Sequence, residues 1–330
     1  DSTPPPRDQT PGTFGQEGVC LITGGLGGLG IVTAEALVEE GACCVVLASR
    51  SGKIKHAGQG LEQRLDDLRR QGVQVVLEQC DTSNEAQVIA MLDRVRSDHG
   101  RVRVVVHAAG VECHEMLHEA SAESVQRVWG AKANGAWYLH KHVPEMEVFM
   151  LFSSLSSLFG NRSAGLYSAA NDYLDEIASV RAKNNQTAIS IQWPFVADVG
   201  MAASLVSHSE EASQGTEWSI PSSTVKQVLK QMLAVESPGS IKSVLTRGYV
   251  ESMSLVPGLA SLLSELPTVS PCALPHVSWR RYGSLHVFGA YFVNQPGPGP
   301  ELTDTWSTTQ ACGKARNAVK AKDITGRSAN

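Results

Sequence analysis

The chain has 330 residues, which is enough to bury a substantial core and, at about 150 residues per domain, enough for roughly two domains. Its net charge of -5 argues against a protein that holds nucleic acid on a broad basic surface. Its 18% of charged residues argue against a long coiled coil or a charged disordered chain. No apolar run reaches the roughly 18 residues of a membrane-spanning helix, so we expect no membrane partner.

Residues 1–17 are rich in Pro, Thr and Gly and are predicted to form a linker. They contain no apolar stretch of the kind found in a signal peptide. The chain begins with Asp, so we expect it to be a segment of a longer protein or a processed product.

Short runs rich in Val, Ile and Leu recur from Val19 onward, separated by longer amphipathic stretches. Continuous apolar runs are typical of strands covered on both faces, and strands that alternate with helices predict a parallel sheet. We therefore predict an α/β fold, a doubly wound parallel sheet of about seven strands with helices on both faces. The predicted strands are 19–23, 43–49, 73–80, 102–110, 148–154, 188–193 and 241–246.

Two of the intervening stretches have a clear helical period. Residues 60–71 place leucines on one face, and residues 83–99 do the same with Val, Met and Leu. Thr82 with Glu85 has the spacing of a capping box, which predicts that the second helix begins just after Thr82.

The pattern decays after about residue 250. Residues 251–330 are rich in Pro, Gly, Ser and Thr and are predicted to be linker or a weakly ordered tail. Within them, 285–293 is apolar enough for one strand or for an interaction segment. Although the length allows two domains, the pattern therefore predicts one domain, residues 18–250.

The cysteines and histidines indicate no metal site. Seven cysteines form no Cys-x-x-Cys pair, and Cys20, Cys43, Cys44 and Cys80 lie in or beside predicted strands. We expect buried free thiols in a reducing compartment, and hence a cytoplasmic protein. The pairs His114/His118 and His140/His142 lack the further ligands of a tetrahedral site.

A glycine-rich turn follows the first predicted strand and opens a helix. Such a turn lets the backbone approach a pyrophosphate, which the free N–H groups of the helix N-terminus then bind. This is the context in which a glycine string predicts a dinucleotide site in a Rossmann-type sheet. The residues predicted to bind cofactor there are Thr23, Gly24, Gly25, Leu26, Gly27, Gly28, Leu29 and Gly30.

The end of the second predicted strand favours NADPH over NADH. Ser49 and Arg50 stand where an NAD site would carry an acidic residue, and an Arg pairs with a 2′-phosphate. The alternative is that Arg50 is a solvated surface charge. Asp81 follows the third strand and either reaches the adenine amino group or starts the next helix.

A candidate catalytic set lies further along the chain. Ser154 ends the fifth predicted strand, Tyr167 follows 13 residues later, and Asn171 shares a helix face with Tyr167. Ser153 competes with Ser154, but the 13-residue spacing favours Ser154. Lys132 lies in the middle of an earlier helix.

These residues resemble, in order, the motifs of the short-chain dehydrogenase/reductase superfamily, and specifically the ketoreductase domains of modular polyketide and animal-type fatty acid synthases. In most of the superfamily a Lys stands four residues after the Tyr. Here that place is taken by Asn171 and the Lys is Lys132, an exchange typical of the synthase ketoreductases. The resemblance covers about residues 18–250. The matching motifs are TGGLGGLG (23–30), SR (49–50), HAAG (107–110), AKANGA (131–136) with LH (139–140), LFSS (151–154) and YSAAN (167–171).

The resemblance implies reduction of a ketone by hydride from NADPH. Tyr167 would donate the proton and Lys132 would favour the phenolate left behind. Ser154 would stabilise the developing alkoxide, and Asn171 would orient Lys132 or hold a relay water. It also implies cofactor contacts from Ala108, Ala109, Gly110, Pro194 and Phe195.

On the substrate side, the resemblance implies a mobile lid that follows Gly200 and contains Met201, which we take as a substrate residue together with Phe159. Two features that distinguish stereochemical classes in the family are altered, because Glu112-Cys113-His114 replaces Leu-Asp-Asp and Phe159 replaces Trp. No stereochemistry is assigned.

The leading hypothesis is an NADPH-dependent reductase of a β-ketoacyl thioester tethered through phosphopantetheine to an acyl carrier protein. The expected partners include neighbouring synthase domains and an upstream structural half. The alternatives are a free-standing reductase of a small ketone or acyl-CoA, and a non-catalytic structural or partner-binding domain.

Overall fold

The computed structural model describes residues 18–54, 58–111, 113, 115–144, 146–161, 163–201, 203, 218–233, 240–246, 288–293 and 305–307. The predicted linker 1–17 and the pair Glu112 and His114 lie outside these residues, as does most of the predicted tail. Within the described residues no helix is long and apolar enough to cross a membrane.

The strands follow the predicted ranges closely. In chain order they are β1 (Val19–Thr23), β2 (Cys44–Ser49), β3 (Gln74–Gln79), β4 (Val102–His107), β5 (Val148–Ser154), β6 (Ile189–Trp193), β7 (Phe195–Val196), β8 (Ser219–Ile220), β9 (Ser240–Thr246), β10 (Phe288–Val293) and β11 (Thr305–Ser307).

Nine of these strands within the described residues form one sheet, in the order β11-β10-β9-β6-β5-β4-β1-β2-β3. The seven predicted strands are mutually parallel. From β1 the chain winds outward to β3, then returns to β4 beside β1 and winds the other way. This reversal between β1 and β4 makes the sheet doubly wound and places its switch point there.

β10 and β11 extend the sheet beyond β9, β10 parallel and β11 antiparallel. They lie in the segment predicted as linker or weakly ordered tail. Residues 285–293 were predicted to be either a strand or an interaction segment, and the structure has a strand at Phe288–Val293. The domain boundary near residue 250 remains a prediction.

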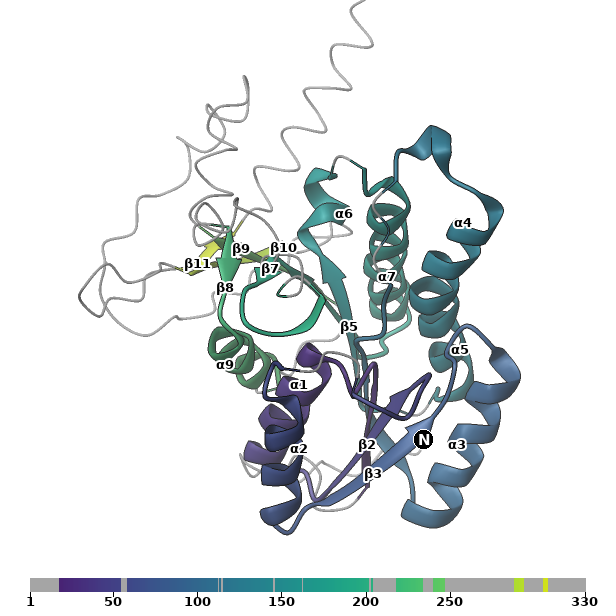
Figure 1. The fold of residues 1–330 in the computed structure, drawn as a ribbon, viewed down its shortest axis with the longest axis vertical. Helices are drawn as coiled ribbons and strands as arrows, with labels where there is room; N and C mark the ends of the chain where they lie inside the picture. Colours follow the sequence, from purple (N-terminus) through teal and green to yellow (C-terminus); the bar gives the residue numbers. More distant parts are fainter. Residues whose placement is uncertain are drawn as a thin grey trace, which may run out of the picture.

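The helices cover both faces of the sheet (Figure 1). α1, α2 and α9 pack on one face, and α3, α5 and α7 on the other. The helices are α1 (Gly28–Glu39), α2 (Leu61–Arg70), α3 (Glu85–His99), η1 (Leu117–Glu119), α4 (Ala122–Trp129), η2 (Gly130–Asn134), α5 (Gly135–His142), α6 (Leu155–Phe159), α7 (Gly165–Lys183) and α9 (Ser222–Leu233).

Two local predictions are corrected. α3 begins at Glu85 with Asn84 as its N-cap, whose side chain accepts a hydrogen bond from the Gln87 N–H, so the predicted Thr82–Glu85 capping box is wrong. Cys43 is exposed, because it lies just before β2, which begins at Cys44 and is the part of this run that the helices cover. Cys20, Cys44, Cys80 and Cys113 are buried free thiols.

Candidate active site

The glycine turn after β1 lies at the switch point of the sheet, packed against the end of β4. Gly24 has φ +70°, and a Cβ there would stand 2.7 Å from the Ala108 carbonyl and the Ala109 nitrogen. At Gly30 a Cβ would clash with the carbonyl oxygen of Gly24. The turn is therefore folded on itself and on β4 so tightly that these two positions admit only glycine.

A hollow of about 350 Å³ opens above this turn. α1 begins at its wall, and the helix has no side-chain cap, so its first N–H groups are free for a ligand. The predicted cofactor residues that line the hollow are Gly24, Gly27, Gly28, Leu29, Gly30, Ser49, Arg50, Asp81, Ala108, Ala109 and Gly110. Thr23, Gly25 and Leu26 do not line it, because they are turned into the interior.

The charged residues of this hollow are Arg50 and Asp81. Arg50 is exposed and makes no hydrogen bond or ion pair within the described residues. Asp81 accepts hydrogen bonds from the backbone and hydroxyl of Ser83, at 3.0 and 2.8 Å, so it organises the turn before α3 while also lining the hollow. Its two predicted roles are compatible.

A second hollow of about 330 Å³ adjoins the first. Leu29, Ala108, Gly110, Gly200 and Met201 line both. The second hollow also contains Lys132, Ser154 and Tyr167 together with Pro194 and Phe195. Phe159 and Asn171 are not among the residues that line it, although Gly160 and Asn161 beside Phe159 are.

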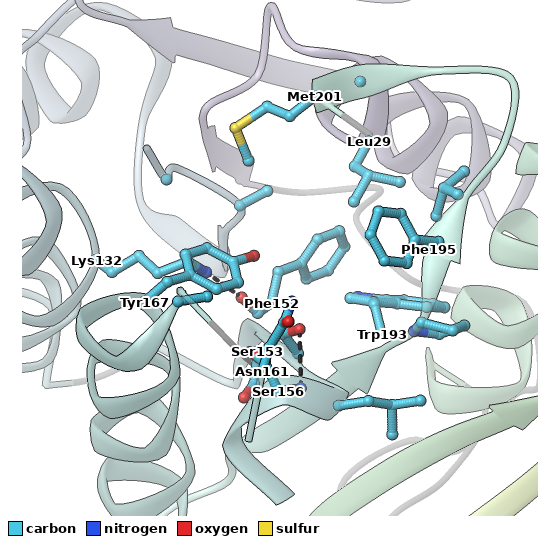
Figure 2. A pocket seen from close by; sticks show the side chains of 18 of the residues that line it. Leu29, Lys132, Phe152, Ser153, Ser156, Asn161, Tyr167, Trp193, Phe195 and Met201 are labelled. Carbon is cyan, nitrogen blue, oxygen red and sulfur yellow. Dashed lines mark hydrogen bonds between the residues drawn. The ribbon is translucent and has the colours of Figure 1, made fainter. Parts of the chain in front are cut away.

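Figure 2 shows how the second hollow is divided. Lys132 and Tyr167 lie on one side, Trp193 and Phe195 on the other, and Met201 comes in from the segment after β7. One wall therefore carries groups that can move a proton, and the opposite wall is apolar.

Lys132 is buried, with its side chain 3% exposed. Its Nζ donates a 2.8 Å hydrogen bond to the carbonyl oxygen of Phe152 and lies 5.3 Å from the centre of the Tyr167 ring. Burial lowers the pKa of Lys132 to about 7, against a smaller opposing effect of the Asp175 carboxylate. The Lys132 amine therefore lies beside Tyr167 and has a pKa near neutral pH.

Lys132 lies in η2, a π-helical turn between α4 and α5, where the Gly135 N–H bonds back to the Gly130 carbonyl five residues earlier. Such turns are rare and occur mostly at functional sites. The sequence predicted a helix around Lys132 and did not predict the π turn.

Asn171 is fully buried one turn after Tyr167. Its Nδ2 donates to the Tyr167 carbonyl at 2.8 Å, and its Oδ1 is buried with no hydrogen-bond partner in the described part of the chain. A buried acceptor of this kind is suited to a bound water.

Ser153 and Ser154 differ in what their hydroxyls do. Ser153 is buried and donates to the Asn171 carbonyl at 3.2 Å. Ser154 Oγ accepts the Ser156 N–H at 3.2 Å, so its own proton is free to be donated into the hollow. The structure therefore favours Ser154, as the 13-residue spacing does.

Two buried polar residues near the site were missed by the sequence analysis. Asp175 lies one turn beyond Asn171 and accepts hydrogen bonds from Ser157, Ser190 and Gln192. Its position two turns after Tyr167 on the same helix face was the available signal. His107, first residue of the HAAG motif, is fully buried below Lys132. Among the described residues no group of three or more His, Cys, Asp or Glu could hold a metal ion.

Comparison with known proteins gives consistent matches. The family described as KR domain matches residues 18–198. Naringenin synthase of Pestalotiopsis fici is 39% identical over 208 residues, 61% of this chain and 7% of that protein. Erythronolide synthase EryA3 of Saccharopolyspora erythraea is 38% identical over 185 residues, 56% of this chain and 6% of that protein. The chain thus spans only a small part of these curated relatives.

Among solved structures, the ketoreductase PlmKR1 from the first module of phoslactomycin biosynthesis in Streptomyces sp. HK803 has a TM-score of 0.60 at 30% identity, covering 72% of this chain and 54% of that one. An A-type ketoreductase from a modular polyketide synthase has a TM-score of 0.59 at 30% identity, covering 66% and 45%.

Proposed function

We propose that this chain, which belongs to the KR domain family of polyketide synthase ketoreductases within the short-chain dehydrogenase/reductase superfamily, uses NADPH to reduce a β-ketoacyl thioester to the β-hydroxyacyl thioester. The observation that carries the proposal is the continuity of the two hollows. Five residues line both, so a ligand held at the glycine turn extends to Tyr167 and Lys132.

The residues of the first hollow fit a dinucleotide. The glycine turn has no side chains at positions where a Cβ would clash, so its backbone can pack tightly beside a ligand. The uncapped N-terminus of α1 offers N–H groups to a pyrophosphate. NADPH, when bound, supplies the hydride that is added to the carbonyl carbon.

The proton comes from the protein. The Tyr167 hydroxyl donates its proton to the carbonyl oxygen, and the Lys132 ammonium favours the phenolate that remains. Ser154 donates a hydrogen bond to the oxygen as it becomes an alkoxide. The unpartnered Oδ1 of Asn171 holds a water through which the proton lost by Tyr167 is replaced.

The choice of NADPH rests on Arg50. Its guanidinium lines the first hollow and has no acidic partner in the described part of the chain, so it is available to a 2′-phosphate. NADH has no phosphate at this position and leaves the guanidinium without a partner.

The proposed substrate is carried by an acyl carrier protein of the same synthase. Trp193, Phe195 and Met201 give the second hollow an apolar wall suited to an acyl chain. The relatives are much longer than this chain, which favours carrier and neighbouring synthase domains, including an upstream structural half, as partners.

The test is NADPH oxidation, followed by its absorbance, with a β-ketoacyl-N-acetylcysteamine thioester and with a simple cyclic ketone. We expect turnover of the thioester to exceed that of the ketone. Preference for the cyclic ketone would favour the free-standing reductase. Absence of turnover together with absence of NADPH binding would favour a non-catalytic domain.

A further inference from the structure

His107 connects the end of β1 to the backbone of Lys132. Its ring is fully buried at the end of β4. The Nδ1 atom lies 2.7 Å from Thr23 Oγ1, and the Nε2 atom lies 2.9 Å from the carbonyl oxygen of Lys132. Both contacts are short and join segments 84 and 25 residues away in sequence.

These two contacts fix the state of the ring. A carbonyl oxygen only accepts, so Nε2 must carry the hydrogen that is donated to Lys132. Burial and the nearby Lys132 amine lower the pKa of His107 to about 3, so the ring is neutral near pH 7. Nδ1 then has no hydrogen and accepts from the Thr23 hydroxyl.

The carbonyl that His107 binds belongs to the π turn. Thr82 Oγ1 donates to the neighbouring Ala131 carbonyl at 3.4 Å, so side chains from outside the helix support two successive carbonyls of η2. The ring also fills the space beside Gly135, where a Cβ would stand 2.8 Å from His107 Cε1. The His107 ring therefore packs closely against the end of the π turn, where only a glycine leaves room for it.

The side chain of Lys132 leaves this turn toward Phe152 and Tyr167. A shift of the Lys132 carbonyl would move Cα and with it the origin of the side chain, and small misplacements of a catalytic group are costly. The Thr23 hydroxyl, at the start of the glycine turn, lies at the other end of the same connection.

We propose that His107 is a positioning residue that holds the π turn so that Lys132 reaches Tyr167, and that the Thr23 hydroxyl, as donor to Nδ1, anchors the ring in the Nε2-protonated tautomer that the Lys132 carbonyl requires. His107 lines neither of the two hollows. The effect on catalysis rests on the proposed function, whereas the tautomer and the hydrogen bonds do not.

The experiment compares His107→Gln with His107→Asn in the full chain. The Gln amide reaches the position of Nε2 and can donate to the Lys132 carbonyl, whereas the Asn amide reaches only the position of Nδ1. We expect His107→Gln to retain most of the kcat and His107→Asn to lose about 10- to 100-fold, the scale expected when a catalytic group is slightly misplaced. The dissociation constant for NADPH should be unchanged in both.

A second measurement does not depend on activity, and its wild-type part does not depend on any variant folding. The nitrogen-15 NMR spectrum of the wild-type chain should show the His107 ring with its proton on Nε2. The signals of this ring should not change between pH 5 and pH 8. Thr23→Val should remove the hydrogen bond to Nδ1 and shift the Nδ1 resonance while Nε2 keeps its proton, and Thr23→Ser should leave both resonances in place.

Equal kcat in the Gln and Asn variants would overturn the positioning role. A wild-type spectrum in which every histidine titrates, or in which the non-titrating ring has a protonated Nδ1, would overturn the tautomer. If the wild type binds NADPH but reduces neither test ketone, the proposed function fails while the spectrum still decides the tautomer.

Discussion

The Nζ atom of Lys132 lies 5.3 Å from the centre of the Tyr167 ring, although the two residues are on different helices and 35 positions apart. η2 carries the lysine and α7 carries the tyrosine. An ammonium beside a tyrosine stabilises the phenolate more than the phenol, which is the physical basis of the role proposed above for Lys132.

The first prediction concerns Tyr167. Tyr167→Phe removes the hydroxyl and keeps the ring, so we expect kcat for the thioester to fall by about 10²- to 10⁴-fold, the range for loss of a general acid. Affinity for NADPH, measured by fluorescence titration, should stay unchanged. The matched control is Tyr173→Phe on the same helix, because Tyr173 stacks on Trp129 and does not line the hollow. A normal rate in Tyr167→Phe would refute the assignment.

The second prediction separates the two adjacent serines. Ser154→Ala removes a donor that faces the hollow, and we expect it to lower kcat by roughly 10- to 1000-fold. Because the same hydroxyl caps α6, the variant should also lower the free energy of unfolding by about 1 kcal/mol. Ser153→Ala removes the bond to the Asn171 carbonyl, so it should lower the free energy of unfolding by about 1 kcal/mol. Steady-state kinetics and urea unfolding of both variants check this, and a larger loss of kcat in Ser153→Ala than in Ser154→Ala would reassign the donor to Ser153.

The third prediction concerns cofactor choice. Arg50→Ala removes the guanidinium from the first hollow, and we expect affinity for NADPH to fall by roughly 10- to 100-fold, the value of a charge-assisted hydrogen bond. Affinity for NADH should not change. Lys53→Ala is the control, since it removes the same charge from the same loop outside the hollow. Equal losses in the two variants would make Arg50 a solvated surface charge.

The fourth prediction concerns the glycine turn. Gly24→Ala places a methyl group 2.7 Å from the Ala108 carbonyl at φ +70°, so we expect it to cost about 2–4 kcal/mol of stability and to abolish NADPH binding. Gly72→Ala is the control, because Gly72 has φ +78° and nothing within 4 Å of an added Cβ. It should cost about 1 kcal/mol from backbone strain only. If Gly24→Ala and Gly72→Ala lower the free energy of unfolding equally, the close packing of Gly24 against Ala108 does not contribute to stability.

The seven main strands were predictable because each is a run of apolar residues that the sheet buries, as at Val19–Thr23. Spacing also predicted the meeting of Tyr167 with Ser154, since a strand end and the next helix of a parallel sheet lie at the same edge. Arg50 and Asp81 follow the ends of neighbouring strands and line the first hollow together for the same reason.

What the sequence did not predict depends on pairings across the fold. Asn84 rather than Thr82 caps α3 because local turn geometry around Asp81 decides which side chain reaches the free N–H groups. The partners of His107 and Asp175 lie on other strands and helices, and no local period encodes them. The π turn at Lys132 receives hydrogen bonds from His107 and Thr82, which likewise lie far from it in sequence.

The fifth prediction concerns the buried amine of Lys132, whose pKa is lowered from 10.5 to about 7 by burial. Below pH 7 the amine is protonated in both the folded and unfolded chain, and the cost of burying the charge is fully present. Between pH 7 and 10.5 the unfolded chain binds more protons than the folded chain, so this contribution to stability rises with pH.

Lys132→Met keeps most of the length of the side chain, and removes the charge and the hydrogen bond to Phe152. We therefore expect it to abolish reduction while raising the free energy of unfolding of the cofactor-free chain by roughly 1–4 kcal/mol at pH 6, and by less at pH 9. Lys141→Met is the control, because Lys141 is exposed on the neighbouring helix and should change stability little at either pH. Urea unfolding at the two pH values checks this. A loss of stability in Lys132→Met at pH 6 would mean that the hydrogen bond to Phe152 outweighs the cost of burying the ammonium.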